Sequence, residues 1–295
     1  MFPIPPPVIP APATVVGRFQ IVSVGASNYI EELNRIGFLL QMFPYVAIDT
    51  EYPGTLHGAP AGPALTTAAR YYAFVKANVD ELPALQLGLT LCDEGGKLPE
   101  AIDDYGRSVQ LAWEFNFSDF DIARGRHAPE SVRFLMSQGF HFDVAREYGV
   151  PSAYFADWLA GVLARLPHWC QPPTWVAFGG AFDFAYMVKM LSGGQPLPDT
   201  PEELVARARY LLRGPVFDAK CMAEHCGRPE LCGAGLRTVA AVLGVPQLDP
   251  APPRLAGPKS HTACRIYTVM RTTLVHGGDG YAYAYAYEGL IDGIY

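Results

Sequence analysis

Two acidic residues one position apart, Asp49 and Glu51, end an apolar stretch in the segment "YVAIDTEYPG" at residues 45–54. Side chains alternate across a β-strand, so residues i and i+2 project from the same face. Two neighbouring carboxylates repel each other and are costly to bury unless a positive charge lies between them. A hard divalent cation, a pair of arginines or exposure to water would each resolve this conflict.

The pair at Asp49 and Glu51 is either a solvated strand end or part of a site, because sites in α/β proteins collect at the ends of strands. Two further acids, Asp183 and Asp218, also follow predicted buried strands. Asp183 lies among aromatic residues in "VAFGGAFDFAYMVK", where it either joins a site or caps the helix that follows. Asp218 in "PVFDAK" is predicted to be the N-cap of the next helix.

His261, in "GPKSHTACRIYTVM", stands at the start of a predicted helix. A histidine in this position is commonly a surface or capping residue. It gains a catalytic role as a general base only if it lies in one pocket with the acids.

The segment "CMAEHCGRPELC" places Cys221, Cys226, Cys232 and His225 within a short stretch. Zinc sites usually combine two closely spaced pairs of ligands, and the spacing here is irregular. Because no secretion signal precedes the chain, we expect a reducing compartment and free thiols. Buried thiols are therefore the favoured interpretation, and a zinc site is the alternative.

Helical and strand patterns alternate along the chain and predict the elements that position these residues. Strands are predicted within 45–51, 85–96, 113–117, 174–180 and 214–220, with a loop at 96–110. Helices are predicted at 29–43, 68–79, 129–140, 152–166, 182–192, 201–212, 235–245 and 260–274. Because the strand at 113–117 is free to pair antiparallel, we predict an α/β protein with a mixed β-sheet flanked by helices.

Composition narrows the classes of function. The net charge of −7 predicts no broad cationic surface for duplex DNA. No apolar run reaches the roughly 18 residues that a membrane span needs. The proline-rich residues 1–17 are predicted to form a disordered arm, and residues 18–295 a single domain. We therefore expect no DNA and no membrane as partners.

Most of residues 27–275 resembles one family. The segments "YVAIDTEYPG", "WEFNF", "SVRFLMSQGFHF", "WVAFGGAFDFAYMVKML" and "GLRTVAAVLGV" follow the order of motifs in the Caf1/Pop-type mRNA deadenylases of the DEDD exoribonuclease superfamily. This resemblance implies an RNase H-like fold and 3′-5′ removal of poly(A) tails with release of AMP. It also implies membership of a multi-protein deadenylation complex, with a scaffold and a second nuclease as partners, in the cytoplasm and the nucleus.

The resemblance also assigns site residues one by one. It implies that Asp49, Glu51 and Asp183 bind Mg²⁺ or Mn²⁺, and that His261 orients or deprotonates the attacking water. The chain departs from the family pattern at two places. Gly179-Gly180 replaces a His-Ser pair, and Ile266 stands where the fourth acid is expected.

The missing acid matters because a two-metal exonuclease holds hard ions through several carboxylates. The water-activating ion is expected to bind weakly unless another acid, for example Asp249 or Asp279, replaces it. Two hypotheses therefore stay open: an exoribonuclease acting on single-stranded poly(A), or a catalytically weakened family member that serves as a binding or regulatory subunit. An unrelated metal phosphatase, based on the D-x-E pair alone, explains less of the chain. Tyr52 and Phe182 either stack on adenines or pack in the core, and core packing is favoured.

Overall fold

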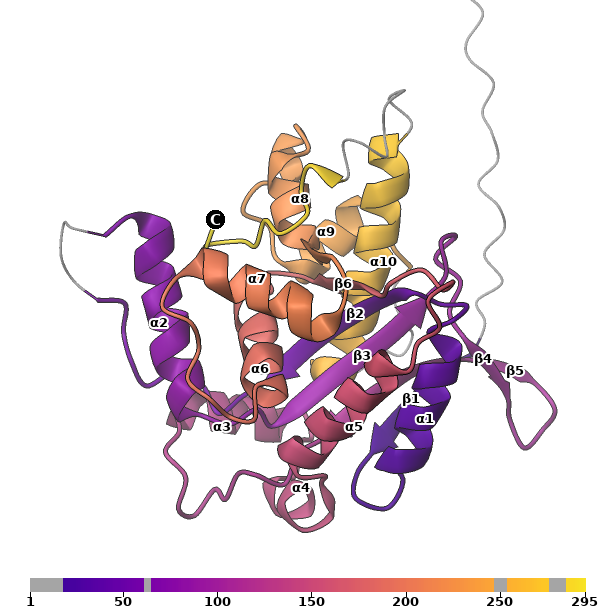
Figure 1. Ribbon diagram of the computed structural model, residues 1–295, viewed down its shortest axis with the longest axis horizontal. Helices are drawn as coiled ribbons and strands as arrows, with labels where there is room; N and C mark the ends of the chain where they lie inside the picture. Colours follow the sequence, from indigo (N-terminus) through magenta and orange to yellow (C-terminus); the bar gives the residue numbers. More distant parts are fainter. Residues whose placement is uncertain (1–17, 61–64, 247–253, 276–284) are drawn as a thin grey trace, which may run out of the picture.

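The central element of the protein is one mixed β-sheet of seven strands (Figure 1). The structure is a computed structural model that describes residues 18–60, 65–246, 254–275 and 285–295. Its strands are β1 Arg18–Val24, β2 Tyr45–Glu51, β3 Gln86–Cys92, β4 Glu100–Ile102, β5 Ser108–Asn116, β6 Thr174–Ala177 and β7 Val216–Asp218. Their order is β1-β5-β3-β2-β6-β7, and β4 pairs with β5 at one side.

The pairing of β2 fixes the edge of the sheet at which the acids lie. β2 runs antiparallel to β3, with Asp49 opposite Gly88, and parallel to β6, with Ala47 opposite Val176. β3 in turn runs antiparallel to β5, with Gly88 opposite Glu114. The strand at "WEFNF" thus pairs antiparallel with β3 within a mixed sheet, as predicted, and it pairs parallel with β1. Because β2, β6 and β7 are parallel, their carboxyl ends meet at one edge of the sheet.

Helices cover both faces of the sheet. They are α1 Tyr29–Leu39, α2 Thr67–Glu81, α3 Pro129–Ser137, α4 Phe142–Tyr148, α5 Ser152–Ala164, α6 Ala181–Leu191, α7 Pro201–Leu212, α8 Ala219–His225, α9 Leu236–Val242 and α10 Ala256–Val275, with a 3₁₀ turn at Pro229–Leu231. In Figure 1, α5, α6 and α7 lie in front of the sheet, and α10 runs behind β2 and β3. Apolar side chains of α1, α2, α5, α6 and α7 form one core cluster, and those of α8, α9 and α10 form a second.

The structure differs from the sequence prediction at a few elements. The predicted loop at 96–110 contains β4 and the beginning of β5, which form an antiparallel pair. The strand β1 and the short helix α4 were not predicted. The last helix begins at Ala256 rather than at Ser260, because Pro258 lies in its first turn, where proline is tolerated.

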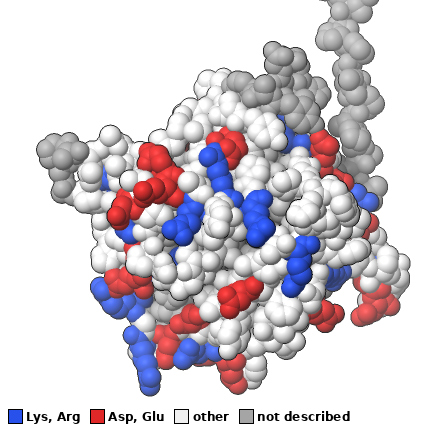
Figure 2. All heavy atoms as spheres, in the orientation of Figure 1, with Lys and Arg blue, Asp and Glu red and all other residues white. Residues whose placement is uncertain are grey.

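Other predictions concern the surface and the ends of the chain. On the face shown in Figure 2, Lys and Arg side chains are interspersed with Asp and Glu and form no broad basic surface. None of the described helices is long and apolar enough to cross a membrane. The predicted arm at 1–17 lies outside the described residues, and the domain limits of 18–295 stay a prediction.

Candidate active site

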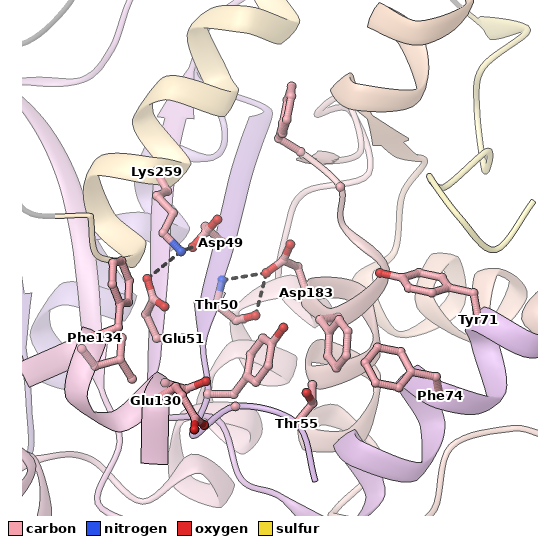
Figure 3. A pocket seen from close by; sticks show the side chains of 17 residues that line it. Asp49, Thr50, Glu51, Thr55, Tyr71, Phe74, Glu130, Phe134, Asp183 and Lys259 are labelled. Atoms are coloured by element: carbon pink, nitrogen blue, oxygen red, sulfur yellow. Dashed lines mark hydrogen bonds and ion pairs between the residues drawn. The ribbon is translucent and has the colours of Figure 1, made fainter. Parts of the chain in front are cut away.

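A cavity of about 680 Å³ lies at the edge of the sheet where β2 and β6 end. Asp49 and Glu51 line it from the end of β2, and Asp183 lines it from the first turn of α6 (Figure 3). The structure therefore brings together the three carboxylates that the sequence singled out. Alternation along β2 and the parallel pairing of β2 with β6 place them there.

Asp183 accepts hydrogen bonds from Thr50, the residue between Asp49 and Glu51. Its Oδ1 accepts hydrogen bonds from Thr50 N at 2.7 Å and from Thr50 Oγ1 at 2.6 Å. Burial raises the pKa of the Asp183 carboxyl well above its usual value, and the nearby Asp49 carboxylate raises it further. The two bonds from Thr50 act in the opposite direction, because they stabilise the ionised form.

Lys259 provides the positive charge that the acidic pair requires. Its Nζ lies 2.7 Å from Glu51 Oε1 and 3.2 Å from Asp49 Oδ2, and Figure 3 shows it reaching from α10 toward both acids. Burial raises the pKa of Glu51 to about 7, with the Lys259 ammonium lowering it and Asp49 raising it. Burial also raises the pKa of Asp49, again opposed by Lys259. The repulsion between the carboxylates of Asp49 and Glu51 is thus compensated by the ammonium group of Lys259.

The carboxylates of the cavity can be compared with the two divalent ions that the family resemblance implies. The three carboxylates offer hard oxygen ligands, but Lys259 already forms ion pairs with two of them. Helix α10 contains no acidic residue. Within the described parts of the chain, no group of three or more His, Cys, Asp or Glu side chains is arranged to hold an ion. The residues as they stand therefore do not fit a two-ion centre. Asp249 and Asp279 lie outside the described residues.

The structure places His261 away from the cavity, contrary to the predicted role as a general base. Its ring centroid lies 4.3 Å from that of Phe19, and Arg265 Nε donates to its Nε2 at 3.4 Å. Lys259 and His261 are two residues apart on α10, so their side chains leave the helix about 200° apart. Only Lys259 can therefore face the acids, and His261 is a buried packing residue.

The burial of His261 is expected to lower the stability of the protein in acid. Burial, and then the charge of Arg265, lower the pKa of His261 from 6.5 to about 3. Between these pH values the His261 imidazole is protonated in the unfolded chain and neutral in the folded chain. The free energy of unfolding therefore falls as the pH drops through this range. Urea denaturation measures the free energy of unfolding at pH 7.5 and at pH 5. We expect it to fall by about 2 kcal/mol less between these pH values in His261→Gln than in the parent protein. The matched control is exposed His168→Gln, and an equal effect of both variants would contradict this reading.

Ile266, at the position that the resemblance assigns to the fourth acid, also lies away from the cavity. Ile266 is fully buried in the second core cluster, with Tyr45 and Ala47 as members of the same cluster, and it does not line the cavity. An aspartate at 266 would place an unpaired charge in that apolar cluster. Ile266 therefore lies away from the cavity, and its match to the fourth acid of the family stays a prediction.

The loop between β6 and α6 reaches the cavity at Gly179. Gly179 has φ +68°, a conformation that favours glycine. A Cβ on Gly180 would lie 2.4 Å from Ala177 Cβ, so this position also requires a residue without a side chain. Asp218 holds this loop through bonds from both glycine amides and caps α8 through Lys220 N, which confirms its predicted N-cap role.

The aromatic residues near the acids pack on one another. The rings of Tyr52 and Phe182 are stacked with centroids 4.7 Å apart, and Phe74 meets Phe182 edge to face. All three line the cavity. Phe134 lines it too and is 42% exposed. Core packing thus accounts for the stacked pair, and Phe134 is the more accessible aromatic surface.

The cysteine segment divides by burial. Cys221 is buried, Cys226 is half-buried and Cys232 is exposed, all three as free thiols. His225 Nδ1 lies 2.9 Å from the carbonyl oxygen of Cys221. The buried-thiol interpretation therefore holds for Cys221 and is wrong for Cys232.

Sequence reasoning missed two residues of the site region, Lys259 and Glu114. Glu114 is opposite Gly88, which is itself opposite Asp49, and its Oε2 accepts a bond from Gly257 N at 3.0 Å. A signal existed in the glycine of "LQLGLTL", since glycine inside a strand often marks the close approach of another backbone. Here α10 makes that approach and brings Lys259 with it.

Comparisons with known proteins show similarity to one family of ribonucleases. The model of the CAF1 family of ribonucleases matches residues 24–156. "Probable CCR4-associated factor 1 homolog 7" of Arabidopsis thaliana is 34% identical over 231 residues, which are 77% of this chain and 78% of that protein. The poly(A) ribonuclease pop2 of Schizosaccharomyces pombe is 35% identical over 183 residues, 62% of this chain and 50% of that protein.

Solved structures show the same fold. S. pombe Pop2p in its Mg²⁺- and Mn²⁺-bound form has a TM-score of 0.76 and 28% identity, covering 92% of this chain and 99% of that one. A yeast CAF1 structure, co-crystallised with the NOT1 MIF4G domain, has a TM-score of 0.70 and 21% identity, covering 96% and 99%. The RNase H-like mixed sheet predicted from the sequence is thereby confirmed.

Proposed function

The chain belongs to the CAF1 family of ribonucleases, and we propose that it is a 3′-5′ exoribonuclease that shortens poly(A) tails and releases AMP, with an activity reduced by Lys259. The observation that supports this proposal is the convergence of Asp49, Glu51 and Asp183 on one open cavity. Phosphodiester hydrolysis in such sites requires charge stabilisation at the phosphate, which bound divalent ions supply. Because Lys259 occupies two of the three carboxylates, we propose that hydrolysis is slow.

The cavity has a wall suited to a single-stranded end. Phe134 on α3 exposes an aromatic face, and single-stranded bases stack on such faces whatever their sequence. Phe178 and Tyr71 line the cavity as well. These residues would hold the 3′-terminal nucleotides, while the net charge of −7 disfavours a long duplex.

We further propose that the protein is a subunit of a deadenylation complex in the cytoplasm and nucleus, with a scaffold and a second nuclease as partners. Support comes from the family and from the yeast relative that was co-crystallised with a NOT1 MIF4G domain. Magnesium or manganese use is proposed from the S. pombe relative that binds both ions, and in this chain it requires Lys259 to leave Asp49 and Glu51.

The activity is tested with purified protein, Mg²⁺ or Mn²⁺, and a 5′-labelled RNA that ends in a 3′ adenosine tract. We expect slow shortening in single-nucleotide steps, and its loss in Asp183→Asn, which removes a carboxylate from the cavity. The matched control is Asp199→Asn, because the Asp199 side chain is 94% exposed and lies outside this cavity. Absence of shortening at enzyme excess, beside an active Pop2, would defeat the nuclease proposal.

A catalytically weakened binding subunit is the second candidate, and the ion pairs of Lys259 favour it. This candidate expects no shortening, with retained binding of adenosine-tract RNA in fluorescence anisotropy. It also expects retained binding to a MIF4G domain in a pull-down. Loss of both kinds of binding in folded protein would exclude it.

A further inference from the structure

Lys259 brings a positive charge into the cavity that contains the acids. Among the cavity-lining residues that the structure describes, it is the one with a positive charge, and it is paired with Asp49 and Glu51. Its side chain is 28% exposed, and the side chains of its two partners are 16% and 9% exposed. A partly exposed cation between two largely buried acids compensates charge that would otherwise be costly to bury.

The start of α10 fixes the position of Lys259. Gly257 N donates to Glu114 Oε2 at 3.0 Å, and Ala256 N donates to Gln86 Oε1 at 3.4 Å. Both acceptors belong to strands of the sheet, so the first turn of the helix is tied to β3 and β5. Lys259 follows in the same turn, so its backbone is already fixed near the end of β2. Less conformational entropy is therefore lost when its ammonium pairs with the acids.

We propose that Lys259 is an internal cation that takes the place of a divalent ion at Asp49 and Glu51 and competes with such an ion for both carboxylates. This inference rests on the proposed function only in taking the cavity as the catalytic site. A divalent ion needs direct contact with carboxylate oxygens, and it would repel an ammonium held against the same atoms. Affinity for Mg²⁺ and Mn²⁺ is then set by the ease with which Lys259 leaves.

The test is Mn²⁺ binding by isothermal calorimetry, without RNA, to the parent protein and to Lys259→Met. The methionine keeps much of the apolar stem and removes the charge. We expect Mn²⁺ to bind the variant more than about tenfold more tightly, because the competing cation is gone. Lys220→Met is the matched control: its side chain is also 28% exposed, and it is paired with Asp292 at 2.6 Å. We expect the control to bind Mn²⁺ like the parent.

Thermal denaturation gives a second readout. Without metal, Lys259→Met is expected to melt at a lower temperature than the parent, and Mn²⁺ is expected to raise its melting temperature more than that of the parent. If Lys259→Met does not fold, Lys259→Gln is measured in the same way. Equal Mn²⁺ affinity in parent and variants, or two tight Mn²⁺ sites in the parent, would overturn the proposal. Tighter Mn²⁺ binding without RNA shortening would support it while defeating the nuclease proposal.

Discussion

Replacing Gly88 with alanine is expected to lower the free energy of unfolding by about 3 kcal/mol or more, the upper part of the range for overpacked cores. A Cβ at this position would lie 1.9 Å from the carbonyl oxygen of Ala256 and 2.7 Å from Gly257 N. Both are backbone atoms at the start of α10, and they cannot rotate away as a flexible side chain can. The helix must move off the sheet, which breaks its packing on β2 and β3.

Urea denaturation followed by circular dichroism measures this loss, with Gly58→Ala as the control. A Cβ on Gly58 meets no atom within 4 Å, so the same chemical change should leave stability within about 0.5 kcal/mol. Hydrogen exchange adds a local readout, because the amides of α10 should exchange faster in Gly88→Ala than those of α6. A loss below about 1 kcal/mol would show that α10 can shift on the sheet at little cost.

The convergence of the three acids was predictable because each step is local or follows a simple rule. Alternation along a strand placed Asp49 and Glu51 on one side, whatever the rest of the fold. The position of Asp183 after a buried strand placed it at a strand end, and parallel strands bring such ends together. The resemblance to the deadenylases then linked these acids, although it did not reveal their contacts.

The contacts of α10 were not predictable in the same way. The proline in "GPKSHTACR" suggested a loop, so the helix was expected to begin after Lys259. Its true start at Ala256 sets which side chains face the sheet, and a rotation of one or two residues exchanges Lys259 for His261. This rotation depends on Gly88 and Glu114, which are far away in the sequence and meet α10 only in the folded protein.

Asp218 shows the opposite case, in which a local prediction was right but incomplete. The sequence indicated an N-cap, and Asp218 Oδ1 does accept from Lys220 N at 2.9 Å. The same side chain also accepts from Gly179 N and Gly180 N, each at 2.8 Å, and from Asp292 N at 3.0 Å. These three partners come from the β6–α6 loop and the C-terminal segment, and no local pattern could reveal them.

Replacing Asp218 with alanine is therefore expected to lower the free energy of unfolding by about 4 kcal/mol, because it leaves four backbone N–H groups without their acceptor. Asp218 is fully buried, so water cannot easily take its place. Burial raises the pKa of its carboxyl, and the four N–H donors act against this by stabilising the ionised form. An arrangement with four donors and no facing acceptor fits a carboxylate rather than a protonated acid.

Asp218→Asn separates the loss of acceptors from the loss of volume. The asparagine has nearly the same size, but its amide nitrogen would present hydrogens to two of the N–H donors. We expect Asp218→Asn to be destabilised by more than about 2 kcal/mol in urea denaturation, and exposed Asp199→Ala by less than about 0.5 kcal/mol. A stable Asp218→Asn would contradict the carboxylate assignment. Because Asp218 holds the loop that leads into α6, its loss should also displace Asp183 and weaken RNA binding even in conditions where the variant is folded.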